Sequence, residues 1–346
     1  MQAAFMNIKF FVRKKYPGYF SIEQLFSAVQ LAMRKHIPPG STCETAEVPF
    51  FFSFLNFFKN IFYVRARQGS INHITGDIHY AILGCSNKNL NVLTIHDCVI
   101  LEKYGKWDPR YWVFRICWYD LPMRKAGLIT VISEKTRTDL LNKIGYGSSK
   151  IRIVSNFVND AFVYTPKVFN KENPELLFIG STANKNLNRI LRAIAGLTCR
   201  LQIIGKISAA QQLFIDNNNI QVQISFELSL EELVEKYTAA DIVLFPSLYE
   251  GFGMLIIEAN AAGRPVITSN MSPMTEVAGK AACFVDPYDI ASIRQGIVKV
   301  TEDDDFRAAI VENGLANARL YRLERVVENY LDLYKEFSGE RLITEN

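Results

Sequence analysis

Two glutamates border a glycine-containing segment in the last third of the chain. Glu250 lies in the run Ser-Leu-Tyr-Glu-Gly-Phe-Gly, and Glu258 follows after seven intervening residues. A carboxylate accepts hydrogen bonds from two hydroxyl groups at once, so acidic residues in such a place are suited to binding a sugar or a ribose. We expect both side chains to border one ligand and to contact different parts of it.

The elements around these glutamates predict an anion site. The apolar run Ile242–Phe245 predicts a strand that Pro246 ends, and Leu255–Ala262 predicts a helix that Gly263 closes. Backbone N–H groups and the helix dipole at such a helix start favour a diphosphate, and glycines allow its close approach. Without further context, a solvated loop and a surface helix remain the alternative. The residues of this expected donor-binding segment are Gly251, Phe252, Gly253, Met254 and Leu255.

A second segment has the same character. Gly180 and Ser181 follow an apolar run, and Lys185 stands just before a helical pattern. Backbone donors combined with the point charge of a lysine suit a diphosphate. Lys206, which follows the run Ile-Ile-Gly, is a further candidate for the phosphate charge. The alternative for each lysine is a solvated surface side chain.

The chain as a whole alternates short apolar runs with helical patterns, which is typical of parallel α/β domains. A lapse of this pattern around Phe162–Pro174 predicts a linker between two domains, 1–165 and 166–320. A final helix in 321–346 can pack on either domain. Two doubly wound domains imply a cleft lined by the carboxyl ends of strands from both. The predicted strands are Asn7–Val12, Ser70–Ile74, Val92–Ile95, Leu128–Ile132, Ile151–Val154, Leu176–Ile179, Leu201–Ile204, Ile220–Ile224, Ile242–Phe245, Val266–Thr268 and Cys283–Val285.

The composition excludes several classes of protein. The 346 residues are 49% hydrophobic and 21% charged, which argues against disorder, and the net charge of +4 is spread too evenly for a nucleic-acid binder. Six dispersed cysteines without a CxxC pair favour reduced thiols in the cytoplasm over disulfides or a zinc site. No stretch is apolar enough for a transmembrane helix. No GxGxxG follows the first strand of either domain, which weakens a dinucleotide-dependent oxidoreductase.

The segment from Pro246 to Glu258 resembles the signature of glycosyltransferase family 4, known as glycosyl transferases group 1. The similarity continues in one register through Gly-Arg-Pro-Val at 263–266, Glu-Val-Ala-Gly at 276–279 and Phe-Val-Asp-Pro at 284–287. It implies the GT-B fold, in which two Rossmann-like domains face a central cleft and the C-terminal one holds most of the donor. It also implies that Glu250 contacts the donor sugar and Glu258 the ribose.

The resemblance assigns roles elsewhere with departures. It implies a phosphate contact for Lys185, but Asn184 stands where the family often has an arginine. His96, in His-Asp at a strand end, matches a histidine that faces the donor sugar. Gly18 is what remains of a glycine-rich loop on the acceptor side. His73 and His79 lie near another strand end and are either acceptor contacts or core residues. The acidic run 302–305 is interpreted as a solvated helix start rather than a metal site.

The stretch Phe50–Tyr63 is the most unusual in composition, with seven phenylalanines, and Arg65 and Arg67 follow it. It reads either as an interfacial helix suited to a lipid-linked acceptor or as a helix packed on the first sheet. Exposure of several of its phenylalanines decides between them, which leaves peripheral contact with a membrane as one of two interpretations.

The resemblance implies a retaining, metal-independent transfer of a hexose from a nucleoside-diphosphate sugar to a hydroxyl of a saccharide or lipid-linked saccharide, with no cofactor and no nucleic acid. Bacterial surface polysaccharide or glycolipid assembly is a setting by analogy only. Glu250 and His96 would orient the sugar, and the helix start and Lys185 would stabilise the leaving diphosphate. A nucleotide-sugar epimerase or hydrolase, or a non-catalytic nucleotide-sugar-binding subunit, remains an alternative. Donor base, sugar, acceptor and oligomeric state are left open.

Overall fold

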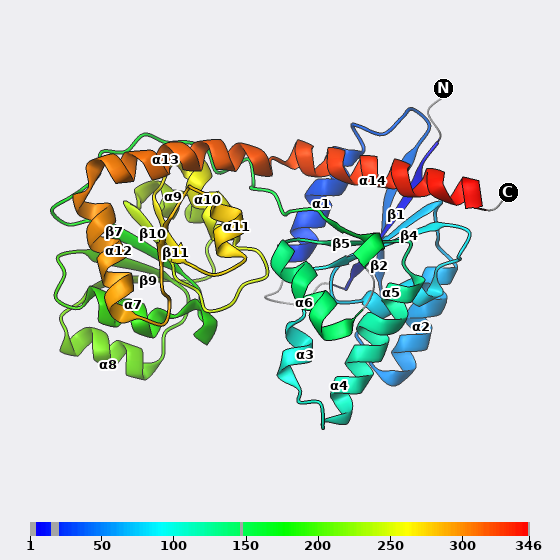
Figure 1. Ribbon diagram of the computed structural model, residues 1–346, viewed down its shortest axis with the longest axis horizontal. Coiled ribbons are helices and arrows are strands. Elements are labelled where there is room, and N and C mark those ends of the chain that lie inside the picture. The colour runs from blue at the N-terminus through cyan, green and yellow to red at the C-terminus, as the bar shows by residue number, and fades with distance from the viewer. Residues whose placement is uncertain (1–4, 15–20, 146–147, 345–346) are drawn as a thin grey trace. The chain divides into compact units, whose positions relative to one another are not determined.

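The computed structural model describes residues 5–14, 21–145 and 148–344. Over these residues the chain forms two compact units, each with its own six-stranded sheet (Figure 1). Unit 1 combines the residues up to Asn156 with the final helix, which begins at Leu323, and unit 2 runs from Phe157 to Arg322. The predicted α/β class with two doubly wound parallel sheets is confirmed. The first break lies nine residues before the expected boundary at 165, and the second lies two residues after the expected boundary at 320.

The sheet of unit 1 is parallel, with the described strands in the order β2-β1-β3-β4-β5-β6. Its strands β3, β4 and β5 are buried along their whole length, as expected for a parallel sheet with helices on both faces. The strands are β1 (Asn7–Arg13), β2 (Thr42–Val48), β3 (Ile71–Ile74), β4 (Leu90–Ile95), β5 (Leu128–Val131) and β6 (Ile151–Ile153).

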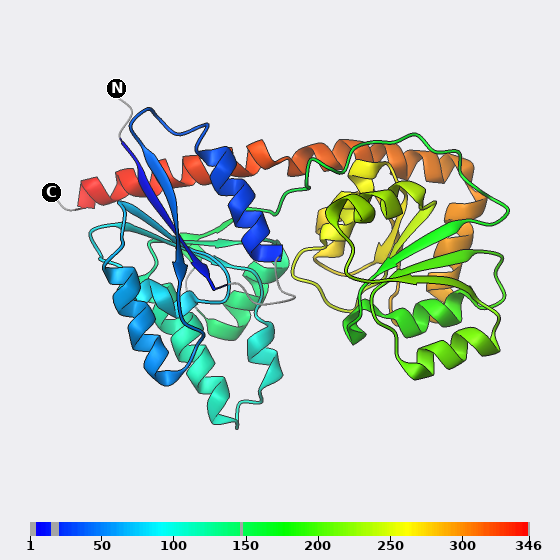
Figure 2. The ribbon, with the colours of Figure 1, turned by 180° about the vertical axis from the view of Figure 1, so that it is seen from behind.

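Helices cover both faces of this sheet (Figures 1 and 2). Two of them, α1 (Ser21–Met33) and α14 (Leu323–Thr344), pack against each other on one face. The remaining helical segments of unit 1 are α2 (Phe54–Arg65), η1 (His79–Gly84), α3 (Val99–Lys103), α4 (Pro109–Phe114), η2 (Arg115–Asp120), α5 (Leu121–Lys125), α6 (Glu134–Ile144) and η3 (Ser148–Lys150).

A row of polar side chains crosses the sheet of unit 1 beneath α14. The His73 imidazole lies 2.6 Å from Thr94 Oγ1 through Nε2 and 2.6 Å from the Tyr334 hydroxyl through Nδ1. Thr94 Oγ1 in turn lies 2.6 Å from Thr130 Oγ1. Because buried polar groups are costly unless they are hydrogen-bonded, this row couples β3, β4 and β5 to the last helix. The last helix is therefore part of the core of unit 1.

The sheet of unit 2 is also parallel, in the order β12-β11-β10-β7-β8-β9. The chain builds β7 first, adds β8 and β9 on one side, and then returns to add β10, β11 and β12 on the other. This is the strand order of a dinucleotide-binding domain, with its switch point between β7 and β10. The strands are β7 (Glu175–Ile179), β8 (Arg200–Ile204), β9 (Gln221–Ser225), β10 (Ile242–Phe245), β11 (Val266–Ser269) and β12 (Cys283–Val285).

Two helices of unit 2, α8 and α9, begin at capping boxes. Ser208 and Ser229 each form a capping box with the side chain three residues later, Gln211 and Glu232. None of the described helices of the chain is long and apolar enough to cross a bilayer. The helical segments of unit 2 are η4 (Ala183–Lys185), α7 (Leu187–Ile194), α8 (Ala209–Asn217), α9 (Leu230–Ala239), α10 (Met254–Ala262), α11 (Met274–Ala278), α12 (Ile290–Glu302), α13 (Asp304–Ala318) and η5 (Arg319–Tyr321).

Candidate functional site

The loops that follow β7 and β10 meet at the switch point of unit 2. These two strands are neighbours in the sheet, and their connections leave toward opposite sides. In open α/β sheets the carboxyl ends of strands at such a point form the usual ligand site. Both segments that the sequence predicts for donor binding, the one at Gly180 and the one at Glu250, therefore lie at the same edge of one sheet.

An ion pair joins the two loops. Lys185 Nζ lies 2.7 Å from Glu250 Oε1, and both side chains are mostly buried, with exposed fractions of 21% and 14%. The lysine stem passes close to Gly180, where a Cβ atom would lie 2.4 Å from Lys185 Cγ, and Gly180 has φ of +144°. Only glycine fits this position, because it tolerates both the conformation and the close contact. The structure thus holds a cation and a carboxylate together at the switch point.

Two asparagines add neutral cross-links between the same loops. Asn184 donates from Nδ2 to the Tyr249 carbonyl at 2.9 Å, and its backbone carbonyl accepts from the Leu248 N–H at 2.8 Å. Asn186, in the left-handed conformation at φ 71°, donates to the carbonyls of Pro246 and Pro287. Asn184 thus supplies a link that shapes the loop, at the position where the resemblance led us to expect an arginine. Asn186 was not predicted from the sequence.

A third loop, after β8, packs on the first. Gly205 has φ of +149°, and a Cβ atom there would lie 2.5 Å from the Gly180 carbonyl oxygen. The N–H of the next residue, Lys206, donates to Ser181 Oγ at 2.8 Å. Glycine at this position therefore lets the β8 loop approach closely enough to bring Lys206 beside the predicted phosphate segment.

These loops line a pocket of about 570 Å³ at the start of α7 and α8. Three of the predicted residues, Gly180, Ser181 and Lys206, are in its wall. Arg189, in the first turn of α7, also lines it and donates to Asn186 Oδ1 at 3.0 Å. Sequence reasoning missed Arg189, although a cation one turn beyond the Lys-Asn pair was a signal for it. Two cations, Arg189 and Lys206, thus border the pocket.

The start of α10 has the form expected of an anion-binding helix end. Gly253 is its N-cap, with φ of 111°, and no side chain caps the first turn. The uncapped first turn leaves backbone N–H groups at Met254 and Leu255 that are available to a ligand. Phe252 is buried, and its ring packs edge-on against Tyr321 at 5.7 Å. Its contribution to a ligand site is therefore limited to the backbone.

Glu258 lies one turn inside α10 and binds a tyrosine. The Tyr237 hydroxyl donates to Glu258 Oε2 at 2.6 Å. Burial raises the pKa of Glu258 above its ordinary value, while the Tyr237 hydrogen bond and the charge of Lys185 act in the lowering direction. Burial and the neighbouring carboxylate raise the pKa of Tyr237 well above its usual range. The Glu258 carboxyl can accept hydrogen bonds from a hydroxyl-rich ligand.

This raised pKa has a consequence for stability. A carboxyl whose pKa is higher in the folded state stabilises that state fully below the unfolded pKa and loses this contribution as pH rises through the folded pKa. We expect Glu258→Gln, which stays neutral, to melt above the parent protein at pH 8 by about 1–3 °C. The difference should shrink toward pH 4.5, and melting curves across this range measure it. A difference that grows as the pH falls would contradict the assignment.

In unit 1, His96 follows β4 at the carboxyl edge of the sheet. It is 9% exposed, its ring packs edge-on against Phe26, and its Nε2 has no hydrogen-bond partner among the described residues. Burial lowers the pKa of His96 to about 3. The imidazole is therefore neutral at physiological pH and has one ring nitrogen left for a ligand.

The residues predicted for the acceptor side have different surroundings. His73 belongs to the buried polar row, with both ring nitrogens bonded. His79 is 2% exposed, with Nδ1 at 2.9 Å from the Trp118 carbonyl. Both contact sets match the alternative that the sequence left open, that of core histidines. Gly18 lies outside the described residues.

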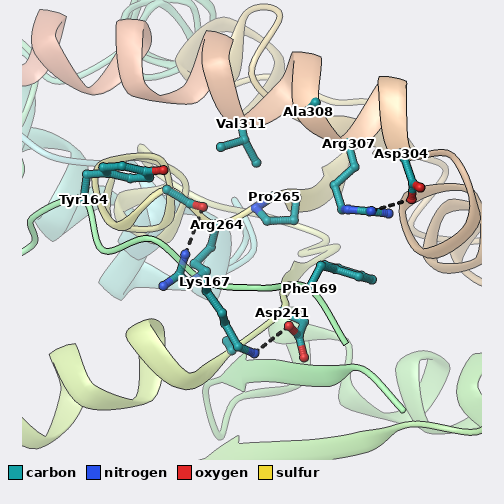
Figure 3. Close-up of a pocket in the computed structure, with 12 residues that line it drawn as sticks. Tyr164, Lys167, Phe169, Asp241, Arg264, Pro265, Asp304, Arg307, Ala308 and Val311 are labelled. Carbon is teal, nitrogen blue, oxygen red and sulfur yellow. Dashed lines mark hydrogen bonds and ion pairs between the residues drawn. The ribbon is translucent and has the colours of Figure 1, made fainter. Parts of the chain in front are cut away.

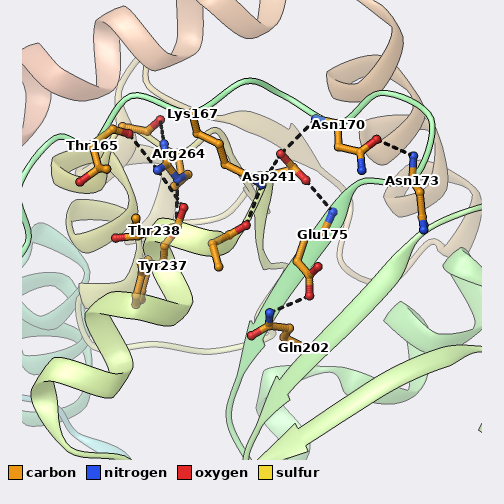
Figure 4. Close-up of polar contacts among 12 residues, drawn as sticks. Thr165, Lys167, Asn170, Asn173, Glu175, Gln202, Tyr237, Thr238, Asp241 and Arg264 are labelled. Atoms are coloured by element: carbon orange, nitrogen blue, oxygen red, sulfur yellow. Dashed lines mark hydrogen bonds and ion pairs between the residues drawn. The ribbon is translucent and has the colours of Figure 1, made fainter.

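A second pocket of unit 2, of about 210 Å³, lies at the amino ends of β10 and β11 (Figure 3). Asp241, just before β10, pairs with Lys167 Nζ and accepts from the backbone N–H groups of Asn170 and Glu175 (Figure 4). Arg264, just before β11, donates to four backbone carbonyls. Because protein groups already bind these two charges, they hold the segment before β7 in place, and we interpret them as structural.

A family model described as Glycosyl transferases group 1 matches residues 165–316, a stretch that lies within unit 2. The O-antigen chain mannosyltransferase B of Escherichia coli is 37% identical over 105 residues, which are 30% of this chain and 28% of that protein. The matched part thus spans little more than a quarter of that relative.

Solved structures agree over nearly the whole chain. Sucrose-phosphate synthase from Thermosynechococcus elongatus has a TM-score of 0.75 at 16% identity, covering 96% of this chain and 100% of that one. HepE from Anabaena, in complex with UDP and glucose, has a TM-score of 0.72 at 16% identity with the same coverage. At such identities the likeness shows the fold, and it confirms the expected GT-B type with two Rossmann-like units. The family model covers somewhat less than half of the chain, and it shows that residues 165–316 are similar to glycosyl transferases group 1.

Proposed function

We propose that this chain transfers a sugar from a nucleoside-diphosphate sugar to a hydroxyl group of a saccharide or lipid-linked acceptor. One observation carries the proposal: the Lys185–Glu250 pair bridges the two loops at the switch point of a unit that matches glycosyl transferases group 1. Phosphate and sugar hydroxyls need a cation and a carboxylate side by side, and this pair supplies both.

In this proposal each charged group of unit 2 has a separate task. The start of α10, together with Lys185, Arg189 and Lys206, binds the diphosphate, since backbone N–H groups and cations both favour it. Glu250 accepts hydrogen bonds from the donor sugar, and Glu258 contacts the ribose. When the donor binds, Lys185 stays paired with Glu250 and donates a further hydrogen bond from its ammonium group to the phosphate. The same groups stabilise the diphosphate as its bond to the sugar breaks.

The stereochemistry and the role of unit 1 are also part of the proposal. We propose a retaining transfer of a hexose without metal or cofactor, as the resemblance to family 4 implies. Positive charge then develops on the sugar ring, and the leaving phosphate takes the proton of the attacking hydroxyl on the same face. His96 is proposed to hydrogen-bond the substrate as a neutral imidazole, because its pKa of about 3 keeps it uncharged.

The similar proteins support a class of substrates. One is named for O-antigen chain synthesis and another was solved with UDP and glucose. We therefore propose a nucleotide-sugar donor, with UDP as the first ligand to test, and an acceptor in bacterial surface polysaccharide or glycolipid assembly. The cysteines among the described residues are free thiols, which supports a cytoplasmic location.

The test combines ligand-induced stabilisation with product analysis. A ligand that binds only the native state raises the melting temperature, so UDP, GDP and ADP are compared with inorganic phosphate as the control. We expect one nucleoside diphosphate to stabilise the protein. The corresponding nucleoside-diphosphate hexose should release free nucleoside diphosphate only when an acceptor is present. Donor turnover without acceptor would favour an epimerase or hydrolase instead. Binding without any release would favour a non-catalytic subunit.

A further inference from the structure

Helix α2 of unit 1 is apolar on its outer face as well as on its inner face, where Phe57 and Tyr63 pack against the core. Its two buried residues are Asn60 and Val64, whereas Phe54, Phe58 and Phe62 are 79%, 47% and 66% exposed. The spacing of four residues places these three rings on one face of the helix. A helix on the surface of a protein that meets only water has polar residues on its outer face. The exposed rings therefore indicate that this face meets something other than water.

The loop before α2 extends this apolar face. Asn60 Nδ2 donates to the Phe50 carbonyl at 2.8 Å and to the Tyr80 hydroxyl at 2.8 Å, and its Oδ1 accepts from the Phe50 N–H. The buried amide thus fixes the loop beside the helix and leaves its phenylalanines half exposed. We call the resulting surface the aromatic face. Its exposed residues are Phe51, Phe52, Phe54, Leu55, Phe58 and Phe62.

Ring contacts connect the aromatic face to a second segment. Phe52 packs edge-on against Trp118 at 4.4 Å between ring centroids and lies 6.4 Å from Phe114. The helical turns that carry these two rings, α4 and η2, themselves expose Trp112 and Ile116. Figures 1 and 2 both show α2 and α4 on the same side of unit 1. An exposed apolar area shared by two helices exceeds the scattered apolar residues of an ordinary surface.

Cations lie over several aromatic rings of α2 and of the loop before it. Lys14 and Lys59 lie over the rings of Phe51 and Phe50, each with Nζ 5.4 Å from the ring centroid, and Arg67 lies over Tyr63 at 4.1 Å. Arg65 is exposed at the end of α2. The sequence has no aspartate or glutamate between Glu47 and Asp77. Phenylalanines flanked by cations, in a stretch of sequence without carboxylates, complement a surface that is apolar beneath anionic headgroups.

We propose that the aromatic face binds the surface of an anionic lipid bilayer, with the phenylalanines inserted at the level of the headgroups and the cations among the phosphates. This proposal goes beyond the donor chemistry and uses none of the residues of the candidate site. It selects between the two interpretations of Phe50–Tyr63, since a core helix would bury the rings that α2 exposes. Binding in the plane of the interface is the mode expected of such a helix.

The experiment is cosedimentation of the full chain, without donor, with vesicles of phosphatidylcholine mixed with phosphatidylglycerol. We expect the triple variant Phe54→Ser, Phe58→Ser and Phe62→Ser to bind these vesicles at least about tenfold more weakly than the parent. Vesicles of phosphatidylcholine alone, and high salt, should also weaken binding of the parent, because screening removes the attraction of the cations. A matched control removes three comparably exposed apolar residues of unit 2, Val168→Ser, Leu213→Ser and Phe226→Ser. It should bind like the parent.

The outcomes separate this proposal from the donor chemistry and from self-association. The triple variant should keep its melting temperature and its response to UDP, because the rings that it removes are exposed. Equal vesicle binding by parent and triple variant would overturn the proposal even if UDP binds. Light scattering that shows a dimer of the parent and a monomer of the triple variant, without binding to vesicles, would overturn it in favour of a second copy of the chain.

Discussion

The Glu250→Ala variant is expected to lose sugar transfer by at least about a thousandfold while its melting temperature stays within about 2 °C of the parent. Glu250 is anchored by Lys185 on the other side of the switch point, so its carboxylate is held in one place before the donor arrives. A group held in this way costs no reorganisation during the reaction, which is why its removal affects turnover far more than folding. Release of the nucleoside diphosphate in the presence of acceptor is the measurement.

Two further variants define the role of Glu250. Glu250→Gln keeps the size and hydrogen-bonding capacity but not the charge, so activity between those of parent and alanine variant indicates a positioning hydrogen bond. Glu235→Ala, an exposed glutamate of α9 in the same unit, is the control and should turn over like the parent. Turnover by Glu250→Ala at the rate of the parent would remove this residue from the mechanism.

Loss of Lys185, the other member of the ion pair, should weaken binding of the nucleoside diphosphate. We expect Lys185→Ala to weaken binding of the nucleoside diphosphate by about a hundredfold, because it removes a cation and leaves the Glu250 carboxylate without that partner beside the phosphates. The double variant Lys185→Ala with Glu250→Gln should then bind more tightly than Lys185→Ala alone, since the repelling charge is gone. Isothermal titration calorimetry of the parent and the three variants measures the coupling.

A lysine outside the switch point gives the comparison. Lys171 precedes β7, at the amino ends of the strands, and pairs with Glu302. The Lys171→Ala variant should therefore bind the nucleoside diphosphate as tightly as the parent. Strictly additive effects of the Lys185 and Glu250 substitutions would show that the ion pair has no influence on the ligand. The pair would then stabilise only the loops.

The two-unit fold was predictable because most strands of both sheets are continuous apolar runs. The predicted strands Ile242–Phe245 and Cys283–Val285 agree with the structure residue for residue. The exception is β2, which the sequence did not predict. It is an edge strand that buries Cys43, Ala46 and Val48 and exposes its other side chains. Its sequence Thr-Cys-Glu-Thr-Ala-Glu-Val therefore contains no continuous apolar stretch. Edge strands carry this weak signal because only one neighbour and one face define them.

Local sequence predicted the loop at Gly180 and the helix start at Gly253, because glycines and a helix pattern define them. It could not predict contacts between distant segments. The pairing of Glu258 with Tyr237 and the bonds of Asn186 to two loops join residues that only the folded sheet brings together. The same is true of His73, whose partner Tyr334 stands 261 residues further along the chain. These interactions depend on tertiary structure, for which residue spacing carries no signal.

The helix α14 has a consequence for how the protein is made. Unit 2 is encoded by one uninterrupted stretch, from Phe157 to Arg322, that lies between the two parts of unit 1. On the ribosome, His73 and Thr94 emerge early, but the helix that covers them is translated only after all of unit 2. At ordinary rates of translation this delay is on the order of ten to thirty seconds. Unit 2 can therefore complete its core during synthesis, while the unit that begins first is finished last.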